Sequence, residues 1–186
     1  AAYKSADLVR RLKQAGADVR VVMSHSAEQF ITPTTLQALS GNPVRTSLWD
    51  ESAEAAMSHI ELARWASKVL VAPASADFIA RLANGQASDL LSTLCLATTA
   101  PIYLAPAMNQ AMWANVATAD NKNLLLQRGV HLLGPASGEQ ACGDVGEGRM
   151  LEPLDIVDAL SGAPKPLTGI KFLITAGPSY EDIDPV

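Results

Sequence analysis

Three stretches of the sequence carry side chains whose chemistry goes beyond packing. The stretch APAMNQAMW, residues 105–113, places Asn109 directly after PIYLAP, an apolar run typical of a buried strand. His59 stands just ahead of an apolar-periodic helix in SHIELARW, and Cys142 stands in the glycine-rich stretch ACGDVGEGRM. An amide offers donors and acceptors, an imidazole exchanges protons near neutral pH, and an exposed thiol is reactive. These residue types favour the hypothesis of a catalytic site over purely structural roles.

Each of these residues also has a plainer interpretation. Asn109 could equally be the N-cap of a helix, because its side-chain oxygen can accept from the first helical N–H groups. A lone histidine is more often a structural residue than a catalytic one, and His25 and His131 carry weaker claims than His59. Cys95, inside STLCLAT, is expected to be a small core residue.

The elements that position these residues follow from the pattern of apolar runs. Runs of Val, Ile and Leu that are apolar at nearly every position suit strands covered on both faces, and amphipathic helical patterns lie between them. This alternation predicts an α/β fold with a doubly wound parallel sheet, a flavodoxin-like or Rossmann-like three-layer sandwich. The expected strands are residues 19–23, 68–73, 101–106, 130–135 and 171–175.

Ligands of such sheets bind beyond the carboxyl ends of the strands, so the residues that follow strands are the first candidates. Ser24 follows the first run, PASAD (73–77) follows the second, and PAMN (106–109) follows the third. Small hydroxyl side chains there let backbone N–H groups approach a flat or phosphorylated ligand. Taken alone, Ser24 and Ser75 are more typical of ordinary helix N-caps.

The composition narrows the class of protein. With 186 residues, 48% of them hydrophobic, the chain is long enough for a well-buried globular domain. Its net charge of −5 and the lack of any Lys/Arg-rich run argue against nucleic acid and membrane as partners. Cys95 and Cys142 form neither a metal-ligand spacing nor a disulfide framework, and no long apolar span occurs. A cytoplasmic protein with reduced thiols and no metal is expected.

The sequence also predicts how the chain is divided. Residues 1–160 form the main domain, residues 161–170 a Pro/Gly/Ser-rich linker, and residues 171–186 the start of another domain. The chain opens in AAYKSADLVRRL, already entering a helix, so a first strand and its loop are expected to be missing. Five glycines and no apolar run between residues 134 and 150 predict a mobile flap with a function.

Four stretches together carry a resemblance to a known family: PASADFIARLANGQASDLL, APAMN, SHIEL and ACGDVGEGRM. They resemble the homo-oligomeric flavin-containing cysteine decarboxylases, most closely the phosphopantothenoylcysteine decarboxylases of coenzyme A biosynthesis. The tail TAGPSYEDIDPV is similar to the opening of the phosphopantothenate–cysteine ligase that follows them in bifunctional bacterial proteins. The resemblance implies FMN as cofactor, phosphopantothenoylcysteine as substrate, and a trimer-based homo-oligomer, often a dodecamer, with the flavin site between subunits.

The resemblance also implies a role for each candidate residue. His59 is implied to be the essential active-site residue, Cys142 to donate a proton late in the cycle, and Asn109 to contact the substrate carboxylate. Further substrate contacts are implied for Met108, Gly146, Gly148, Arg149 and Met150, and FMN contacts for Ser24, Phe30, Ser75, Ala76, Asp77, Phe78 and Ala107. Many relatives carry Asn-Thr in place of Asp77 and Phe78.

The implied reaction oxidises the cysteinyl thiol to a thioaldehyde, releases carbon dioxide to give an enethiol, and reduces that product again. Peptidyl-cysteine decarboxylases are the first alternative, and phosphatase-regulatory subunits of the same fold, which bind without turnover, are another. A flavin prenyltransferase ranks below them. The joint presence of His59, Asn109 and Cys142 favours an enzyme, and the ligase-like tail argues against the peptide decarboxylases.

Overall fold

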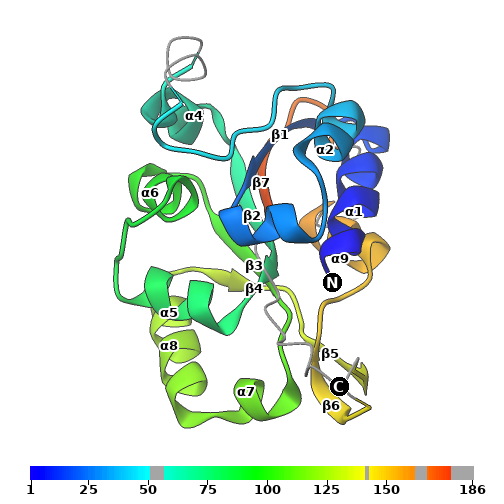
Figure 1. Cartoon of the computed structure of the whole chain (residues 1–186), viewed down its shortest axis with the longest axis vertical. Helices are drawn as coiled ribbons and strands as arrows, with labels where there is room; N and C mark the ends of the chain where they lie inside the picture. Colours follow the sequence, from blue (N-terminus) through cyan, green and yellow to red (C-terminus); the bar gives the residue numbers. More distant parts are fainter. Residues whose placement is uncertain (51–56, 141–142, 162–166, 177–186) are drawn as a thin grey trace.

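The part of the chain that the structure describes, residues 1–50, 57–140, 143–161 and 167–176, is built on a five-stranded parallel sheet (Figure 1). In this computed structural model the strands lie in the order β1, β7, β2, β3, β4. Their bounds are Asp18–Met23 (β1), Lys171–Ala176 (β7), Lys68–Ala74 (β2), Ile102–Pro106 (β3) and His131–Leu132 (β4). The predicted doubly wound parallel sheet is confirmed.

The central strands form because they are apolar on both faces. β2 is buried from Val69 to Ala74, and β7 is buried from Phe172 to Ala176. A strand covered by helices on both sides needs apolar side chains at every position rather than at alternate ones. β4 is shorter than predicted, and at this edge His131 stacks on Tyr103 with ring centroids 4.7 Å apart.

Helices cover both faces of the sheet and complete the three layers (Figure 1). α1, α2 and α9 pack on one face around one core cluster, and α4, α5, α6 and α8 pack on the other around a second. The bounds are Ala2–Gln14 (α1), Pro33–Ser40 (α2), His59–Trp65 (α4), Ala76–Ala83 (α5), Leu90–Ala97 (α6), Val116–Gln127 (α8) and Pro153–Ser161 (α9), with a 3-10 helix η1 at His25–Gln29 and a short helix α7 at Gln110–Ala114.

Local capping residues fix where several of these helices begin and end. Ser58 and Glu61 form a reciprocal capping box at the start of α4, and Asp89 and Ser92 form another at the start of α6. Such side chains satisfy N–H groups that the first helical turn leaves without partners. Gly41 ends α2 with a φ of 73°, a left-handed conformation that glycine adopts readily.

β7 lies inside the sheet, between β1 and β2, although it comes last along the described chain. It pairs in parallel with β1 on one side and with β2 on the other. The structure therefore uses residues 171–176, which the sequence assigns to the start of another domain, as a strand of this sheet. The run from Phe172 to Ala176 is apolar enough for a position covered on both faces. Residues 162–166 and 177–186 lie outside the described residues, and the division into domains stays a prediction.

The segment predicted as a flap contains an antiparallel hairpin of β5 (Ala136–Glu139) and β6 (Val145–Arg149). Figure 1 shows this hairpin at the lower end of the molecule, near α7. The sequence analysis missed both strands, because glycines and charged residues leave no apolar alternation to detect.

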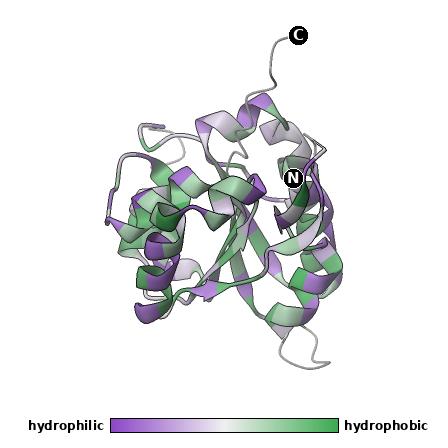
Figure 2. Cartoon of the chain, turned by 90° about the horizontal axis from the view of Figure 1, so that it is seen from below, coloured by the Kyte–Doolittle hydropathy of each residue, from purple (hydrophilic) through white to green (hydrophobic). Residues whose placement is uncertain are grey.

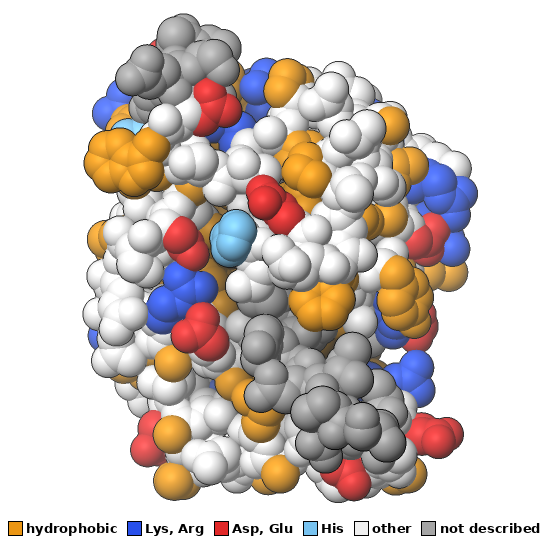
Figure 3. Space-filling view, in the orientation of Figure 1, with side chains coloured by type: hydrophobic (Ala, Val, Ile, Leu, Met, Phe, Trp, Pro, Cys, Tyr) orange, Lys and Arg blue, Asp and Glu red, His pale blue; other side chains and the backbone are white. Residues whose placement is uncertain are grey.

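The distribution of hydrophobic and hydrophilic residues agrees with a sheet that is buried between helices. Figure 2 shows mostly hydrophobic strands in the middle and hydrophilic residues on the outward sides of the helices. On the face in Figure 3, Lys and Arg side chains are interspersed with Asp and Glu, so its described part lacks the broad basic field that nucleic acid phosphates require. Among the described helices, none has the length and apolar character needed to span a bilayer.

Replacing Ile174 by alanine tests the place of β7. Ile174 is fully buried, so the change should leave a cavity and lower the free energy of unfolding by about 2–5 kcal/mol. Leu126→Ala on α8, where the side chain is 47% exposed, is the control and should stay within about 0.5 kcal/mol. Urea unfolding followed by circular dichroism measures both. Equally small effects would show that β7 is not packed in this sheet.

Candidate active site

The β5–β6 hairpin is hydrogen-bonded onto the residues that follow β3. The Met108 N–H donates to the Gly148 carbonyl at 2.9 Å, and the Gln110 N–H donates to Gln140 Oε1 at 3.0 Å. Two segments that are far apart in the sequence therefore meet. The predicted substrate residues of PAMN and of the flap come together at this contact.

The hairpin lies this close because two of its positions are glycine. A Cβ built on Gly148 would lie 2.2 Å from the Met108 carbonyl oxygen, and one built on Gly146 would lie 2.1 Å from Gln110 Oε1. Neither distance is possible without displacement of the neighbour, since interiors are close-packed. The Gln110 side chain can turn away, whereas the Met108 backbone is held by its hydrogen bond. Gly148 is therefore the stricter requirement.

Asn109 is a helix N-cap, the plainer of the roles that the sequence leaves open, and it also bonds to the hairpin. Its Oδ1 accepts from the Ala111 N–H at 2.8 Å and caps α7, while its Nδ2 donates to Asp144 Oδ2 at 3.0 Å. Because an oxygen must face the Ala111 N–H, the amide is oriented with its NH₂ group toward the hairpin. Asn109 thus presents a donor, the group that a carboxylate ligand needs.

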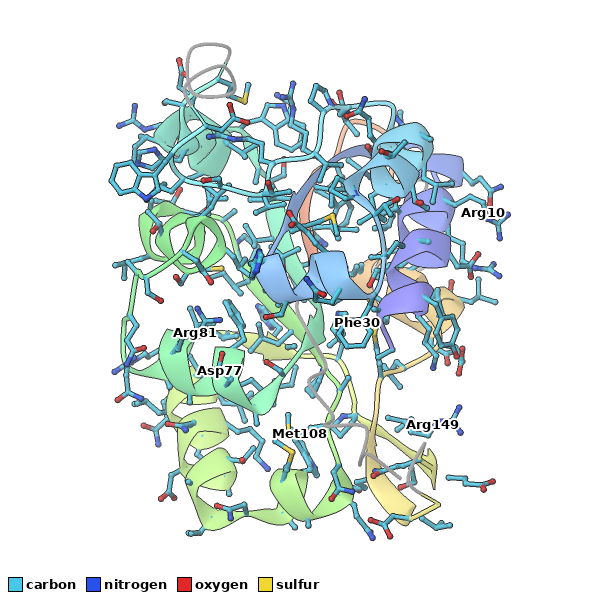
Figure 4. All side chains as sticks on the ribbon, viewed as in Figure 1. Arg10, Phe30, Asp77, Arg81, Met108 and Arg149 are labelled. Carbon is cyan, nitrogen blue, oxygen red and sulfur yellow. The ribbon has the colours of Figure 1, made fainter. Side chains whose placement is uncertain are left out.

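A cavity of about 410 Å³ lies where the hairpin meets the end of β3 and the start of α1. Five predicted site residues line it: Ala107, Met108, Gly148, Arg149 and Met150. The remaining lining residues are Ala1, Tyr3, Lys4, Glu139 and Gln140. In the view of Figure 4, Met108 and Arg149 both lie in the lower half of the molecule, at the end of β3 and on the hairpin.

Lys4 is a residue of this cavity that the sequence analysis missed. Its side chain is largely buried, and its Nζ donates to the Met150 carbonyl at 2.9 Å and to Glu152 at 2.7 Å. The hydrogen bond from Lys4 lowers the pKa of the Glu152 carboxyl. A signal was present, because Lys4 precedes Leu8 by four residues and so falls on the apolar face of α1. A lysine on a buried helical face needs a partner or a ligand.

A second cavity, of about 290 Å³, adjoins the end of β1 and the start of α5. Ser24 and Asp77, both predicted to contact the cofactor, line it together with Arg81 and Asp89. Arg81 donates to Asp77 at 2.9 Å and to Asp89 at 2.7 Å, and Figure 4 shows Arg81 beside Asp77. Burial alone would raise the pKa of Asp89, but hydrogen bonds from Arg81 and Ser92 outweigh it and hold that pKa below its ordinary value. Arg81 therefore sits between two carboxylates, a role that its four-residue spacing from Asp77 could have indicated.

Several predicted cofactor residues serve the local fold. Ser24 Oγ accepts from the Ala27 N–H and caps η1, and Ser75 Oγ accepts from the Phe78 N–H and caps α5. The Phe78 side chain is fully buried in the core, and its N–H is already bonded to Ser75 Oγ. Phe30, at the end of η1, is by contrast 50% exposed. Their contacts with a cofactor stay predictions.

His59 lies at the other end of the sheet from Asn109. It is the first residue of α4, which leads into the beginning of β2, whereas Asn109 follows the end of β3. These two strands run parallel, and the five residues of β3 span about 16 Å. Figure 1 accordingly shows α4 at the top of the view and α7 at the bottom. One chain does not bring the two residues together, and Cys142 lies outside the described residues.

The expectation for Cys95 is confirmed. Its side chain is buried in the core cluster with α4, α5 and α6, and burial raises the pKa of its thiol to about 12. Such a thiol stays protonated and unreactive at neutral pH. In the described ranges, no three His, Cys, Asp or Glu side chains are grouped so as to hold a metal ion.

A family comparison identifies the chain. A family model described as "Flavoprotein" matches residues 1–163, which include the sheet edge, the hairpin and both cavities. The chain belongs to the flavoprotein family. This membership confirms the resemblance drawn from the sequence motifs, and the matched range ends before β7.

A curated relative supports the same family assignment. The coenzyme A biosynthesis bifunctional protein CoaBC of Vibrio cholerae is 60% identical over 188 residues, which cover 100% of this chain and 47% of that protein. The chain thus spans about half the length of the curated relatives it matches.

Two solved structures are similar to this flavoprotein. A cysteine-to-serine mutant of PPC decarboxylase complexed with pantothenoylaminoethenethiol has a TM-score of 0.74 and 32% identity, covering 86% of this chain and 89% of its own. SpaF, an FMN-dependent cysteine decarboxylase, has a TM-score of 0.69 and 25% identity, covering 87% and 91%.

Replacing Gly148 by alanine tests the seating of the hairpin. The added Cβ should displace the Met108 carbonyl and break the 2.9 Å hydrogen bond from the Met108 N–H. We expect the Met108 amide to exchange its hydrogen at least about tenfold faster, measured by hydrogen exchange with mass spectrometry. Gly85→Ala is the control, because Gly85 also has a positive φ of 65° but has nothing within 4 Å of its added Cβ. Unchanged protection of Met108 in Gly148→Ala would contradict this account.

Proposed function

We propose that this flavoprotein catalyses the FMN-dependent decarboxylation of phosphopantothenoylcysteine to phosphopantetheine in coenzyme A biosynthesis. The observation that carries the proposal is the cavity between the docked hairpin and the 107–108 segment, with the NH₂ group of Asn109 turned toward the hairpin. Similarity to CoaBC and to PPC decarboxylase supports the same reaction.

The residues at the carboxyl end of the sheet fit FMN. Ser24 and Thr46 bring hydroxyl groups to the second cavity, and the start of α5, at Ala76 and Asp77, presents backbone N–H groups suited to an anion. The half-exposed ring of Phe30 offers a flat apolar surface to a planar ring system. When bound there, FMN supplies the oxidation of the substrate thiol to a thioaldehyde and the later return of the electrons.

The side chains of the chain itself orient the substrate and move its protons. Asn109 donates to the substrate carboxylate and holds it out of the plane of the thioaldehyde, so that the breaking C–C bond overlaps the π system. Loss of carbon dioxide then leaves the electron pair on sulfur as an enethiolate, which takes up a proton to become the enethiol. Cys142 donates the proton that the enethiol carbon takes up on reduction.

The phosphate of the substrate accounts for the two cations of the first cavity. Lys4 and Arg149 both line it, and an ammonium and a guanidinium are the groups that bind phosphate oxygens. The Lys4 Nζ is already held by the Met150 carbonyl and Glu152, so it is positioned before the ligand arrives. Gly148 and Met150 contribute backbone or packing surface to the same pocket, and Gly146 lets the hairpin approach Gln110.

We propose that the enzyme is a homo-oligomer in which the active site is shared between subunits. His59 and Asn109 lie at opposite ends of the sheet within one chain, so a site that uses both needs His59 from a neighbouring copy. We place the enzyme in the cytoplasm as a trimer-based oligomer, with a phosphopantothenate–cysteine ligase domain in the same protein. The family match ends at residue 163 and CoaBC is about twice as long, which supports the second domain.

Replacing Asn109 by aspartate separates its two roles. Aspartate keeps the cap of α7 but removes the Nδ2 donor and places a charge against the substrate carboxylate. We expect kcat/KM for carbon dioxide release to fall by about 100-fold or more, while the flavin absorption stays as in the wild type. Asn115→Asp is the matched control, because Asn115 caps α8 through the Ala117 N–H in the same way. Equal activities of the two variants would remove Asn109 from the mechanism.

Mixing two inactive variants tests the shared site. His59→Asn and Asn109→Asp subunits, co-expressed with different tags, should form mixed oligomers in which about a quarter of the sites keep both residues intact. Activity should therefore return in doubly purified mixtures and stay absent in oligomers of either variant alone. If mixed oligomers form but stay inactive, His59 and Asn109 do not meet across an interface.

A further inference from the structure

The contact between Asn109 and Asp144 places a carboxylate of the hairpin where the substrate carboxylate is proposed to bind. Asp144 Oδ2 accepts from Asn109 Nδ2 at 3.0 Å, and the Asp144 carbonyl accepts from the Gln140 N–H at 2.8 Å. The backbone bond fixes the end of the hairpin loop, so the side chain is directed at Asn109. The cap from the Ala111 N–H fixes the other end of the amide.

Asp144 and the substrate present the same chemical group to the same donor. Two carboxylates on one NH₂ group repel each other, so the arrival of the substrate favours the departure of Asp144. We propose that Asp144 is a specificity-determining residue: it occupies the Asn109 donor until a ligand that carries its own carboxylate replaces it. The inference rests on the proposed function and adds which ligands that site retains.

The exchange distinguishes the substrate from the product. Phosphopantothenoylcysteine brings a carboxylate to Asn109, whereas phosphopantetheine has lost it as carbon dioxide. A ligand without this group gains nothing from Asn109, and the bond between Asn109 and Asp144 forms again. The decarboxylated product is therefore held less tightly than the acid, which favours its release.

The hairpin does not need to leave for this exchange. The bonds of Met108 to Gly148 and of Gln110 to Gln140 involve the backbone or another side chain, not the Asp144 carboxylate. Asp144 is also exposed, so water can solvate its carboxylate when it moves away. The exchange therefore moves the Asp144 side chain and leaves these two bonds of the hairpin in place.

The experiment compares two unreactive ligands that differ only in the carboxylate. Phosphopantothenoylserine carries a hydroxyl in place of the thiol and keeps the carboxylate, and phosphopantothenoylethanolamine is its decarboxylated counterpart. Their dissociation constants for the FMN-loaded protein are measured by isothermal titration calorimetry in wild type, Asp144→Ala and Glu147→Gln. Glu147 is the matched control, because it is a hairpin carboxylate bonded to the Trp113 indole N–H at 3.2 Å and not to Asn109.

We expect Asp144→Ala to bind the serine ligand about fivefold more tightly, since no internal hydrogen bond to a charged group has to be given up. Its affinity for the ethanolamine ligand should stay within about twofold, and Glu147→Gln should resemble the wild type. Unchanged or weaker binding of the serine ligand by Asp144→Ala would overturn the inference, weaker binding meaning that Asp144 only orients Asn109. If wild type binds neither ligand, it is the proposed substrate class that fails.

Discussion

Burial of the parallel sheet on both faces is the constraint on which the rest of this structure depends. Side chains in the middle of β2 and β7 face helices on either side and must be apolar. Polar groups therefore gather where strands end, and the two cavities, which seven of the fifteen candidate residues line, lie at the ends of β1 and β3. The sheet provides a rigid edge, and the chemistry is left to the few residues that follow it.

The position of the hairpin depends on close packing as well. The hairpin adds no apolar core of its own, and it is held by backbone hydrogen bonds and by close glycine contacts with the residues after β3. Asn109 makes two contacts there, because its side-chain oxygen caps α7 while its side-chain nitrogen donates to the hairpin. The helix cap thus decides which end of the amide faces the hairpin.

Much of the fold could be predicted because parallel strands that are buried on both faces are apolar along their whole length. The placement of β7 could not, since an apolar run shows that a strand will be covered but not which neighbours it will have. The motif residues Met108, Gly148, Arg149 and Met150 all line the first cavity, and their roles stay predictions, whereas the contacts of Lys4, Asp144 and Arg81 were not expected. These contacts come from partners distant in sequence or from a helical face that looked ordinary. His59 marks a different limit, because the sequence pattern does not show that it and Asn109 lie at opposite ends of the sheet within one chain.

The buried ammonium of Lys4 also has a mechanical meaning. By holding the Met150 carbonyl and Glu152, it ties the segment that follows the hairpin to the first turn of α1, which is itself packed on the sheet. Gly148 lies two residues before Met150, so this anchor also favours the register in which the Met108 N–H meets the Gly148 carbonyl. The seating of the hairpin thus depends on the first turn of the N-terminal helix as well as on the residues after β3.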